Sequence, residues 1–206
     1  MRENSQRITA AIVAGGASSR FGGLPKGLES VGGKRIVDRV MLAAMAVTQD
    51  VILVSNSNDA ASWLPEVRVV RDVRPERGSI VGIHTALIAA RTPVLVLAWD
   101  MPFVTSDLLR LIVERSANEP FAVLPEGPSG LEPFCALYTP ACLPAVERAI
   151  DDGDLRATSL PLRFPSFTRI ARSEVETIGD SAQLFFNVNS AADLARAEEI
   201  ERSRHR

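Results

Sequence analysis

A glycine-rich loop that ends in a lysine follows the first apolar run of the chain. It reads Val13-Ala14-Gly15-Gly16-Ala17-Ser18-Ser19-Arg20-Phe21-Gly22-Gly23-Leu24-Pro25-Lys26-Gly27. Glycines let backbone N–H groups come close to phosphate oxygens, a lysine adds a compact charge, and an arginine can hold two oxygens at once. The loop therefore predicts a phosphate site in which Arg20 and Lys26 neutralise charge. The alternative is that Lys26 is a solvated loop cation.

The spacing of the glycines separates this loop from two common phosphate loops. Lys26 precedes a glycine instead of Ser or Thr, and Gly15 directly precedes Gly16. The loop thus matches neither the Gly-x-x-x-x-Gly-Lys-Ser/Thr pattern nor the Gly-x-Gly-x-x-Gly pattern. Walker-type ATPases and dinucleotide-binding Rossmann domains are disfavoured.

A single carboxylate, Asp100, ends another apolar run, and Pro102 stops that run two residues later. Side chains at the carboxyl end of a parallel strand face the crevice where α/β proteins bind ligands. Mg²⁺ accepts one or two carboxylates together with phosphates and waters, so Asp100 is predicted to bind Mg²⁺, the alternative being a helix cap. Lys26 and Asp100 are expected on a solvent-facing rim, so that replacing either one leaves the fold intact.

Other polar residues and glycines follow the remaining strands. Asn56 and Asp72 each come after an apolar run and are expected at the same edge of the sheet. Gly78 and Gly82 flank the start of a predicted helix, where free N–H groups attract anions. The crevice is therefore predicted to hold a second phosphate cradle at this helix start.

Apolar runs alternate with amphipathic stretches, and this rhythm predicts an α/β fold with a mostly parallel sheet and helices on both faces. Strands are expected at 8–14, 51–55, 67–71, 94–98, 121–124 and 133–138, the last one antiparallel at the sheet margin. Helices are expected at 35–47, 79–90, 106–117, 141–150 and 191–200. Ser190 and Asp193 form a capping box for the last helix. One domain over 1–206 is expected, with frayed tails at 1–7 and 202–206.

The composition disfavours several classes of function. The chain has 206 residues with 23 basic and 25 acidic side chains, and its net charge of −2 is unlike that of a dedicated nucleic-acid binder. The apolar runs are far shorter than the roughly 20 residues of a membrane span, and the polar N-terminus has no signal-peptide pattern. A cytoplasmic protein without membrane or nucleic-acid partners is expected. Cys135, Cys142 and the two histidines fit neither a zinc motif nor a hydrolase triad.

Five segments stand in a fixed order along the chain. They are Ala14-Gly15-Gly16 with Arg20 and Lys26, then 78–82, Trp99-Asp100-Met101-Pro102, Glu132-Pro133-Phe134-Cys135-Ala136-Leu137-Tyr138 and Phe186-Asn187-Val188-Asn189. In this order they resemble the molybdenum cofactor guanylyltransferases over nearly the whole chain. The resemblance implies a three-layer, Rossmann-like nucleotidyltransferase fold with a small antiparallel portion, shared with cytidylyltransferases and sugar-1-phosphate nucleotidyltransferases.

The resemblance also implies a reaction and a set of site residues. GMP would pass from GTP to the terminal phosphate of a molybdopterin-type acceptor, with Mg²⁺ as cofactor and cofactor delivery or acceptor proteins as partners. The implied nucleotide contacts are Val13, Ala14, Gly15, Gly16, Lys26, Asn56, Asp72 and Asp100. The implied acceptor contacts are Gly78, Gly82, Asn187 and Asn189. Asp100 is the implied metal ligand, and it forms the implied catalytic set with Lys26 and Arg20.

Two positions disagree on the nucleobase. Gly15 is typical of guanylyl members and leaves room for a purine, whereas Pro25 before the lysine is commoner in cytidylyl and sugar-phosphate enzymes. A cytidylyl- or sugar-1-phosphate nucleotidyltransferase is therefore the alternative enzyme, and a non-catalytic nucleotide-binding partner protein is the alternative of another class. Trp99 replaces a customary cysteine, which predicts a differently shaped acceptor pocket.

Overall fold

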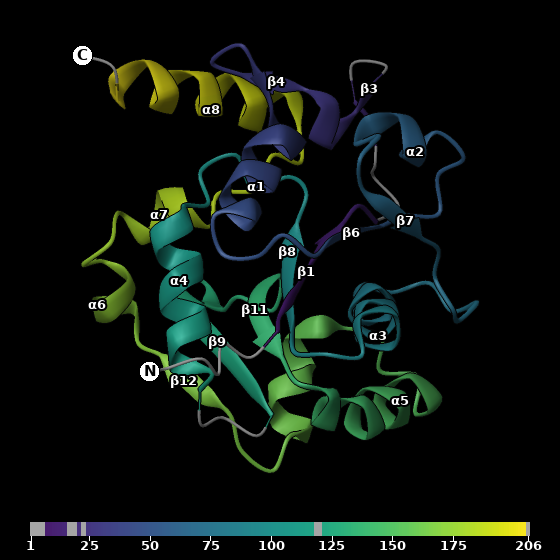
Figure 1. The fold of residues 1–206 in the computed structure, drawn as a ribbon. Helices are drawn as coiled ribbons and strands as arrows, with labels where there is room; N and C mark the ends of the chain where they lie inside the picture. Colours follow the sequence, from purple (N-terminus) through teal and green to yellow (C-terminus); the bar gives the residue numbers. More distant parts are fainter. Residues whose placement is uncertain (1–6, 16–19, 22–23, 118–120, 205–206) are drawn as a thin grey trace.

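The protein is built around one mixed β-sheet (Figure 1). In this computed structural model the structure describes residues 7–15, 20–21, 24–117 and 121–204, and at 20, 21 and 24 it describes the backbone alone. The strand order is β10-β9-β11-β8-β1-β6-β7, and β12 pairs with β9. The strands are β1 (Thr9–Val13), β6 (Val51–Val54), β7 (Arg68–Val70), β8 (Val94–Ala98), β9 (Ala122–Gly127), β10 (Gly130–Leu131), β11 (Cys135–Tyr138) and β12 (Thr168–Ile170).

The centre of the sheet is parallel and its margin is antiparallel. In the parallel part, Ala10 of β1 lies opposite Val51 of β6 and Leu95 of β8. β11 runs antiparallel to both β8 and β9, which confirms the expected direction of the 133–138 strand. β12 was not expected, because only one of its three residues is buried and its sequence therefore lacks an apolar run.

Helices and short elements complete the chain. The helices are α1 (Ile36–Met45), α2 (Ala60–Trp63), α3 (Ser79–Ala90), α4 (Ser106–Arg115), α5 (Leu143–Asp151), α6 (Arg172–Val175), α7 (Ser181–Leu184) and α8 (Ala191–Arg204). Three 3₁₀ helices are present among the described residues, namely η1 (Lys26–Leu28), η2 (Pro140–Cys142) and η3 (Ala157–Arg163). Two short hairpins pair β2 (Arg20–Phe21) with β3 (Leu24–Pro25), and β4 (Ser30–Val31) with β5 (Lys34–Arg35). Residues 202–204 of the tail that is expected to fray belong to helix α8. In the described part of the chain no helix is long and apolar enough to span a bilayer.

Alternation of side chains along β1 separates two helical layers. Ala10 and Ile12 belong to the core that includes α1 and α4, whereas Ala11 and Val13 belong to the core that includes α3 and α5. Figure 1 shows these helix pairs on opposite sides of the sheet. Burying both faces of a parallel strand requires continuous apolar sequence, which is what β1 has. The expected three-layer α/β fold is confirmed.

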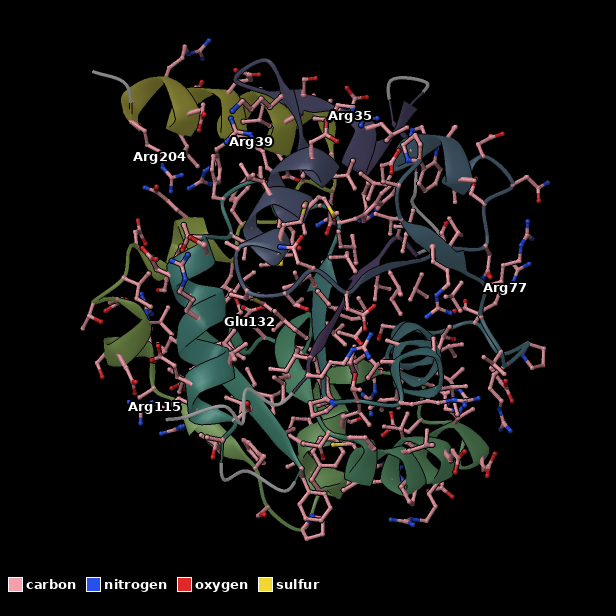
Figure 2. The ribbon with its side chains drawn as sticks, in the orientation of Figure 1. Arg35, Arg39, Arg77, Arg115, Glu132 and Arg204 are labelled. Carbon is pink, nitrogen blue, oxygen red and sulfur yellow. The ribbon has the colours of Figure 1, made fainter. Side chains whose placement is uncertain are left out.

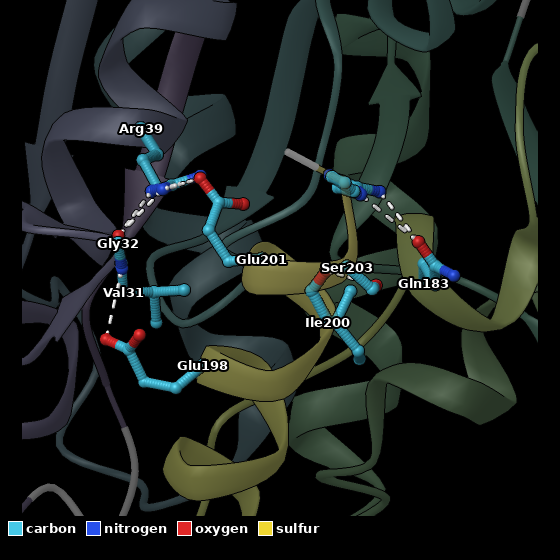
Figure 3. A network of polar contacts seen from close by, with 9 residues as sticks. Val31, Gly32, Arg39, Gln183, Glu198, Ile200, Glu201 and Ser203 are labelled. Atoms are coloured by element: carbon cyan, nitrogen blue, oxygen red, sulfur yellow. Dashed lines mark hydrogen bonds and ion pairs between the residues drawn. The ribbon is translucent and has the colours of Figure 1, made fainter. Parts of the chain in front are cut away.

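The C-terminal helix α8 packs at one edge of the molecule, against the β4–β5 hairpin and α1 (Figures 1 and 3). The Gly32 N–H donates to Glu198 Oε1 at 3.0 Å, and Arg39 Nη2 donates to Glu201 Oε1 at 2.5 Å. Arg39 also donates to the Val31 carbonyl. A small apolar core lies beneath these contacts and comprises Val31, Ile36, Phe103, Val188 and Ala197. The segment that precedes α8 is thereby held against the middle of the molecule.

Candidate active site

The glycine-rich loop leaves the sheet between two neighbouring strands. The Ala14 N–H donates to the Val54 carbonyl at 2.8 Å, and the Val13 carbonyl accepts from the Trp99 N–H at 3.3 Å. Gly15 is exposed, and a Cβ atom built on it meets no heavy atom within 4 Å in the described part of the chain. The described residues around Gly15 therefore do not require a glycine at this position.

Two predicted phosphate contacts of the loop cannot be placed. Gly16 lies outside the described residues. The Arg20 backbone belongs to β2 and pairs with Pro25, but its side chain also lies outside the description.

Lys26 is buried at the start of η1, with 7% of its surface exposed. Its ammonium forms an ion pair with Asp100 Oδ2 and donates to Asn189 Oδ1 at 2.8 Å. Asp100 is 5% exposed. The expectation that Lys26 and Asp100 stand on a solvent-facing rim is wrong, because η1 folds the lysine back onto the carboxylate that follows β8. Removing one member of such a buried pair costs about 3–5 kcal/mol of stability, so these positions also support the fold.

Close packing of Gly27 against Trp99 explains the position of the lysine. A Cβ atom on Gly27 would lie 2.4 Å from the Trp99 ring, so any other residue type would force the ring to shift. The Trp99 ring in turn stacks on Trp63 with centroids 5.0 Å apart. Trp99 therefore fixes η1 from the core. Trp99 is only 1% exposed, so any effect of this residue on the shape of an acceptor pocket acts through the neighbours that it positions.

The segment 187–189 joins the edge of the sheet next to Asp100. The Asp100 carbonyl accepts from the Val188 N–H at 2.9 Å, and the neighbouring Asn189 reaches Lys26. Asn187 instead donates from Nδ2 to the Phe185 carbonyl at 2.9 Å. The capping box after this segment is confirmed, since the Asp193 N–H donates to Ser190 Oγ and the Ser190 hydroxyl donates to Asp193 Oδ2. Of the two asparagines, Asn189 is the one that meets the predicted catalytic pair.

Asn56 and Asp72 come together at the carboxyl ends of β6 and β7. Asn56 Nδ2 donates to Asp72 Oδ2 at 2.6 Å, and the Asp72 N–H donates to Asn56 Oδ1 at 2.9 Å. The Thr85 hydroxyl on α3 donates to the other oxygen of Asp72 at 3.2 Å. Both side chains are thus oriented in advance, which lowers the entropic cost of using them on a ligand.

Gly78 and Gly82 let α3 pack closely against its neighbours. A Cβ on Gly82 would lie 2.6 Å from Val13 Cγ1, and one on Gly78 would lie 2.4 Å from Leu155 Cβ. The Ile80 N–H already donates to the Leu155 carbonyl at 3.2 Å, and the Val81 N–H donates to the Gly78 carbonyl. Two of the amides at this helix start are thus already bonded within the protein, so the second phosphate cradle stays a prediction that rests on the remaining amides. The glycines bring α3 close to the end of β1.

Asp100 is the carboxylate of this site that could bind a divalent metal. The described residues contain no group of three His, Cys, Asp or Glu side chains placed to hold a metal ion. Mg²⁺ accepts a single carboxylate when phosphate oxygens and waters supply its remaining ligands. Asp100 therefore fits a metal that arrives together with a phosphate chain, and such a metal would compete with Lys26 for the same carboxylate.

Glu132 is a half-buried ionisable group to which the sequence assigned no individual role. It precedes β11 by three residues, and Gly127 makes room for it, since a Cβ on Gly127 would lie 2.3 Å from Glu132 Oε1. Figure 2 shows Glu132 within the body of the molecule, while Arg77 and Arg115 lie at its margins. Burial raises the pKa of this carboxyl to about 7. Only its place in the Glu132-Pro133 motif could have drawn attention to it.

Comparison with known proteins identifies relatives that match this chain over nearly their whole length. Residues 10–162 match the family described as MobA-like NTP transferase domain. The chain is 31% identical to the molybdenum cofactor guanylyltransferase of Desulfosudis oleivorans, over 93% of this chain and 94% of that protein. It is 33% identical to a probable molybdenum cofactor guanylyltransferase of Pelotomaculum thermopropionicum, over 93% and 92%.

A solved structure shows the same arrangement of elements. It is that of molybdopterin-guanine dinucleotide biosynthesis protein A from Archaeoglobus fulgidus, with a TM-score of 0.78 and 27% identity. The superposition covers 95% of this chain and 99% of that one. With the family match and the full-length relatives, these findings show that the chain belongs to the MobA-like NTP transferase family and is a nucleotidyltransferase.

Proposed function

We propose that this nucleotidyltransferase transfers GMP from GTP to the terminal phosphate of molybdenum-molybdopterin, giving molybdopterin guanine dinucleotide and pyrophosphate. The names of the relatives at 31% and 33% identity support this substrate pair. The observation that carries the proposal is the convergence of Lys26, Asp100 and Asn189 at one edge of the sheet. A lysine from the nucleotide loop there meets an asparagine from the segment assigned to the acceptor.

The reaction needs alignment and charge neutralisation more than proton transfer. An oxygen of the acceptor phosphate attacks the α-phosphorus of GTP, and the bond from that phosphorus to the oxygen bridging to the β-phosphorus breaks. The leaving pyrophosphate keeps the electron pair of the broken bond. The second pKa of a phosphomonoester is about 6, so the nucleophile is mostly dianionic at neutral pH and needs no general base. Repulsion between two polyanions is the main obstacle, and fixed cations reduce it.

Each predicted residue then has a physical task. Lys26 neutralises charge on the triphosphate, together with the side chain of Arg20, and the amides of Gly15 and Gly16 bind its oxygens. Val13 and Ala14, whose place is at the end of β1, border the nucleotide. Asn56 and Asp72 bind the nucleoside, while Asn187 and Asn189 with α3 behind Gly78 and Gly82 border the acceptor. Asp100 would hold Mg²⁺, which supplies electrostatic stabilisation of the phosphate charges when bound.

Calorimetric titration of GTP, CTP and UTP in the presence of Mg²⁺ tests the nucleotide half of the proposal. We expect GTP to bind selectively, because Gly15 is exposed and a Cβ atom on it would meet none of the described residues within 4 Å, as a purine beside the backbone would require. Lys26→Met is expected to weaken GTP binding by an order of magnitude or more, since it removes a charge-assisted contact. Lys34 is the other lysine of the chain and is exposed, so Lys34→Met is the matched control and should bind GTP as the parent does.

Other outcomes of this titration would support other functions. A preference for CTP or UTP would follow Pro25 and favour a cytidylyl- or sugar-1-phosphate nucleotidyltransferase. GTP binding without release of pyrophosphate in the presence of the acceptor would favour a non-catalytic nucleotide-binding partner protein. Pyrophosphate release that depends on both GTP and molybdenum-molybdopterin would establish the complete reaction.

A further inference from the structure

The ion pair between Lys26 and Asp100 occupies the groups that the reaction needs. The Lys26 ammonium touches Asp100 Oδ2 and Asn189 Oδ1, and the lysine and aspartate side chains are 8% and 7% exposed. A lysine on this carboxylate is not on a phosphate, and a carboxylate neutralised by lysine attracts a metal ion less strongly. At this low exposure, solvent screens the pair weakly, so the competition is strong.

We propose that Lys26 is the counter-ion of Asp100 in the nucleotide-free protein, and that a divalent metal binds Asp100 strongly only when nucleotide phosphates draw Lys26 away. This inference rests on the proposed function for the identity of the nucleotide. The competition itself needs only the observed ion pair. Metal and nucleotide are then positively coupled, and each strengthens the binding of the other by the same factor.

Asn189 connects this exchange to the acceptor side. Its side-chain oxygen accepts from Lys26, and its neighbour Val188 donates to the Asp100 carbonyl. When Lys26 moves onto phosphate, Asn189 Oδ1 loses its donor and becomes available to another one. Asn189 is therefore a positioning residue for Lys26 before the nucleotide binds, and it is released for the acceptor afterwards.

Binding of Mn²⁺ to the protein without nucleotide tests the proposal directly. Electron paramagnetic resonance of unbound Mn²⁺ gives the dissociation constant without any assay of activity. We expect weak binding by the parent and binding about tenfold tighter or more by Lys26→Met, because the carboxylate then lacks its counter-ion. Lys34→Met removes the same charge from an exposed position and should bind Mn²⁺ as the parent does. Lys26→Met with Asp100→Asn should lose the gain.

A second variant keeps the test valid if Lys26→Met fails to fold, which circular dichroism and thermal melting would show. Asn189 is exposed, so Asn189→Ala should fold, and it removes one acceptor that holds the ammonium in place. We expect this variant to bind Mn²⁺ more tightly than the parent by a smaller factor. Unchanged Mn²⁺ affinity in the folded variants would overturn the counter-ion proposal whatever nucleotide the protein prefers. Selectivity for CTP with tighter Mn²⁺ binding would instead overturn the proposed substrate alone.

Discussion

At the scale of single residues, two glycines of the glycine-rich loop differ in how closely their neighbours pack against them. Gly27 lies beneath Trp99, where a Cβ atom would be 2.4 Å from a ring carbon. Gly15 is exposed, and a Cβ atom there would have no neighbour within 4 Å in the described part of the chain. The fold therefore requires a glycine at position 27, whereas only a ligand would require one at position 15.

The pair of variants Gly27→Ala and Gly15→Ala separates these roles. We expect Gly27→Ala to lower the free energy of unfolding by about 1–3 kcal/mol, because the tryptophan stack must shift to admit the methyl group. Gly15→Ala should leave this free energy within about 0.5 kcal/mol of the parent and weaken GTP binding. Urea denaturation and calorimetry measure the two effects. Equal stability loss in both variants would contradict the assignment.

Glu132 should make stability depend on pH near neutrality. Its pKa rises from 4.5 to about 7 on folding because burial disfavours the charged form. Between these values the folded protein binds more protons than the unfolded chain, so the free energy of unfolding falls as pH rises. We expect Glu132→Gln to remove this pH dependence. The free energy of unfolding of the variant minus that of the parent should then rise by about 1–3 kcal/mol between about pH 4.5 and about pH 8. Urea denaturation at both pH values checks this, and a constant difference would refute it.

At the scale of elements, helix α8 is held by polar contacts and by a small apolar face. Only Ala197 of its fourteen residues is buried, with Leu194 and Ile200 partly buried beside it, so the contacts to Gly32 and Arg39 shown in Figure 3 should contribute to its attachment. Arg39 and Glu201 have side-chain exposures of 15% and 12%, whereas the pair of Arg110 and Asp107 on α4 has exposures of 51% and 70%. Solvent screening should make these two ion pairs unequal.

Double-mutant cycles with alanine quantify this difference. For Arg39 and Glu201 we expect a coupling energy of about 1–3 kcal/mol, typical of a hydrogen-bonded charge shielded from solvent. For Arg110 and Asp107 we expect no more than about 0.5 kcal/mol. Denaturation of the single and double variants gives both values. Similar couplings for the two pairs would mean that α8 is fixed by its small apolar core instead.

The elements that sequence predicted well are those with long apolar periodicity. The sequence predicts helix α3 and strand β8 with their observed bounds, because each contains a run of consecutive, mostly apolar residues that are buried. The short elements β12 and η1 have no such pattern. Their positions depend on partners far away in the chain, such as Leu124 for β12 and Asp100 for η1. For the same reason the burial of Lys26 could not be derived from its glycine-rich surroundings.

At the scale of the whole molecule, the two apolar cores share the strands of a single sheet. Neighbouring residues of β1 and of β8 alternate between the cores, so neither core can be lost while the other keeps its strands. The expectation of one domain can therefore be tested by following the unfolding of both cores. The two tryptophans of the chain stack on each other in the α1 and α4 core, and they report on that core alone.

Unfolding by urea should therefore be a single cooperative transition. We expect tryptophan fluorescence and far-ultraviolet circular dichroism to give the same midpoint, because a two-state chain loses both signals together. The fluorescence follows one core and the circular dichroism follows all helices, so the comparison is informative. Separate midpoints would show that part of the chain unfolds independently.

The contact between Lys26 and Asn189 spans 163 positions of sequence, and this has a consequence during protein synthesis. The ribosome completes β1, β6 to β9 and β11 before it adds Asn189, Glu198 and Glu201. A nascent chain thus contains the family-matched residues 10–162 while Lys26 still lacks one of its two partners. Products of premature termination that end before Asn189 would carry most of the sheet without this contact, and we expect them to be inactive.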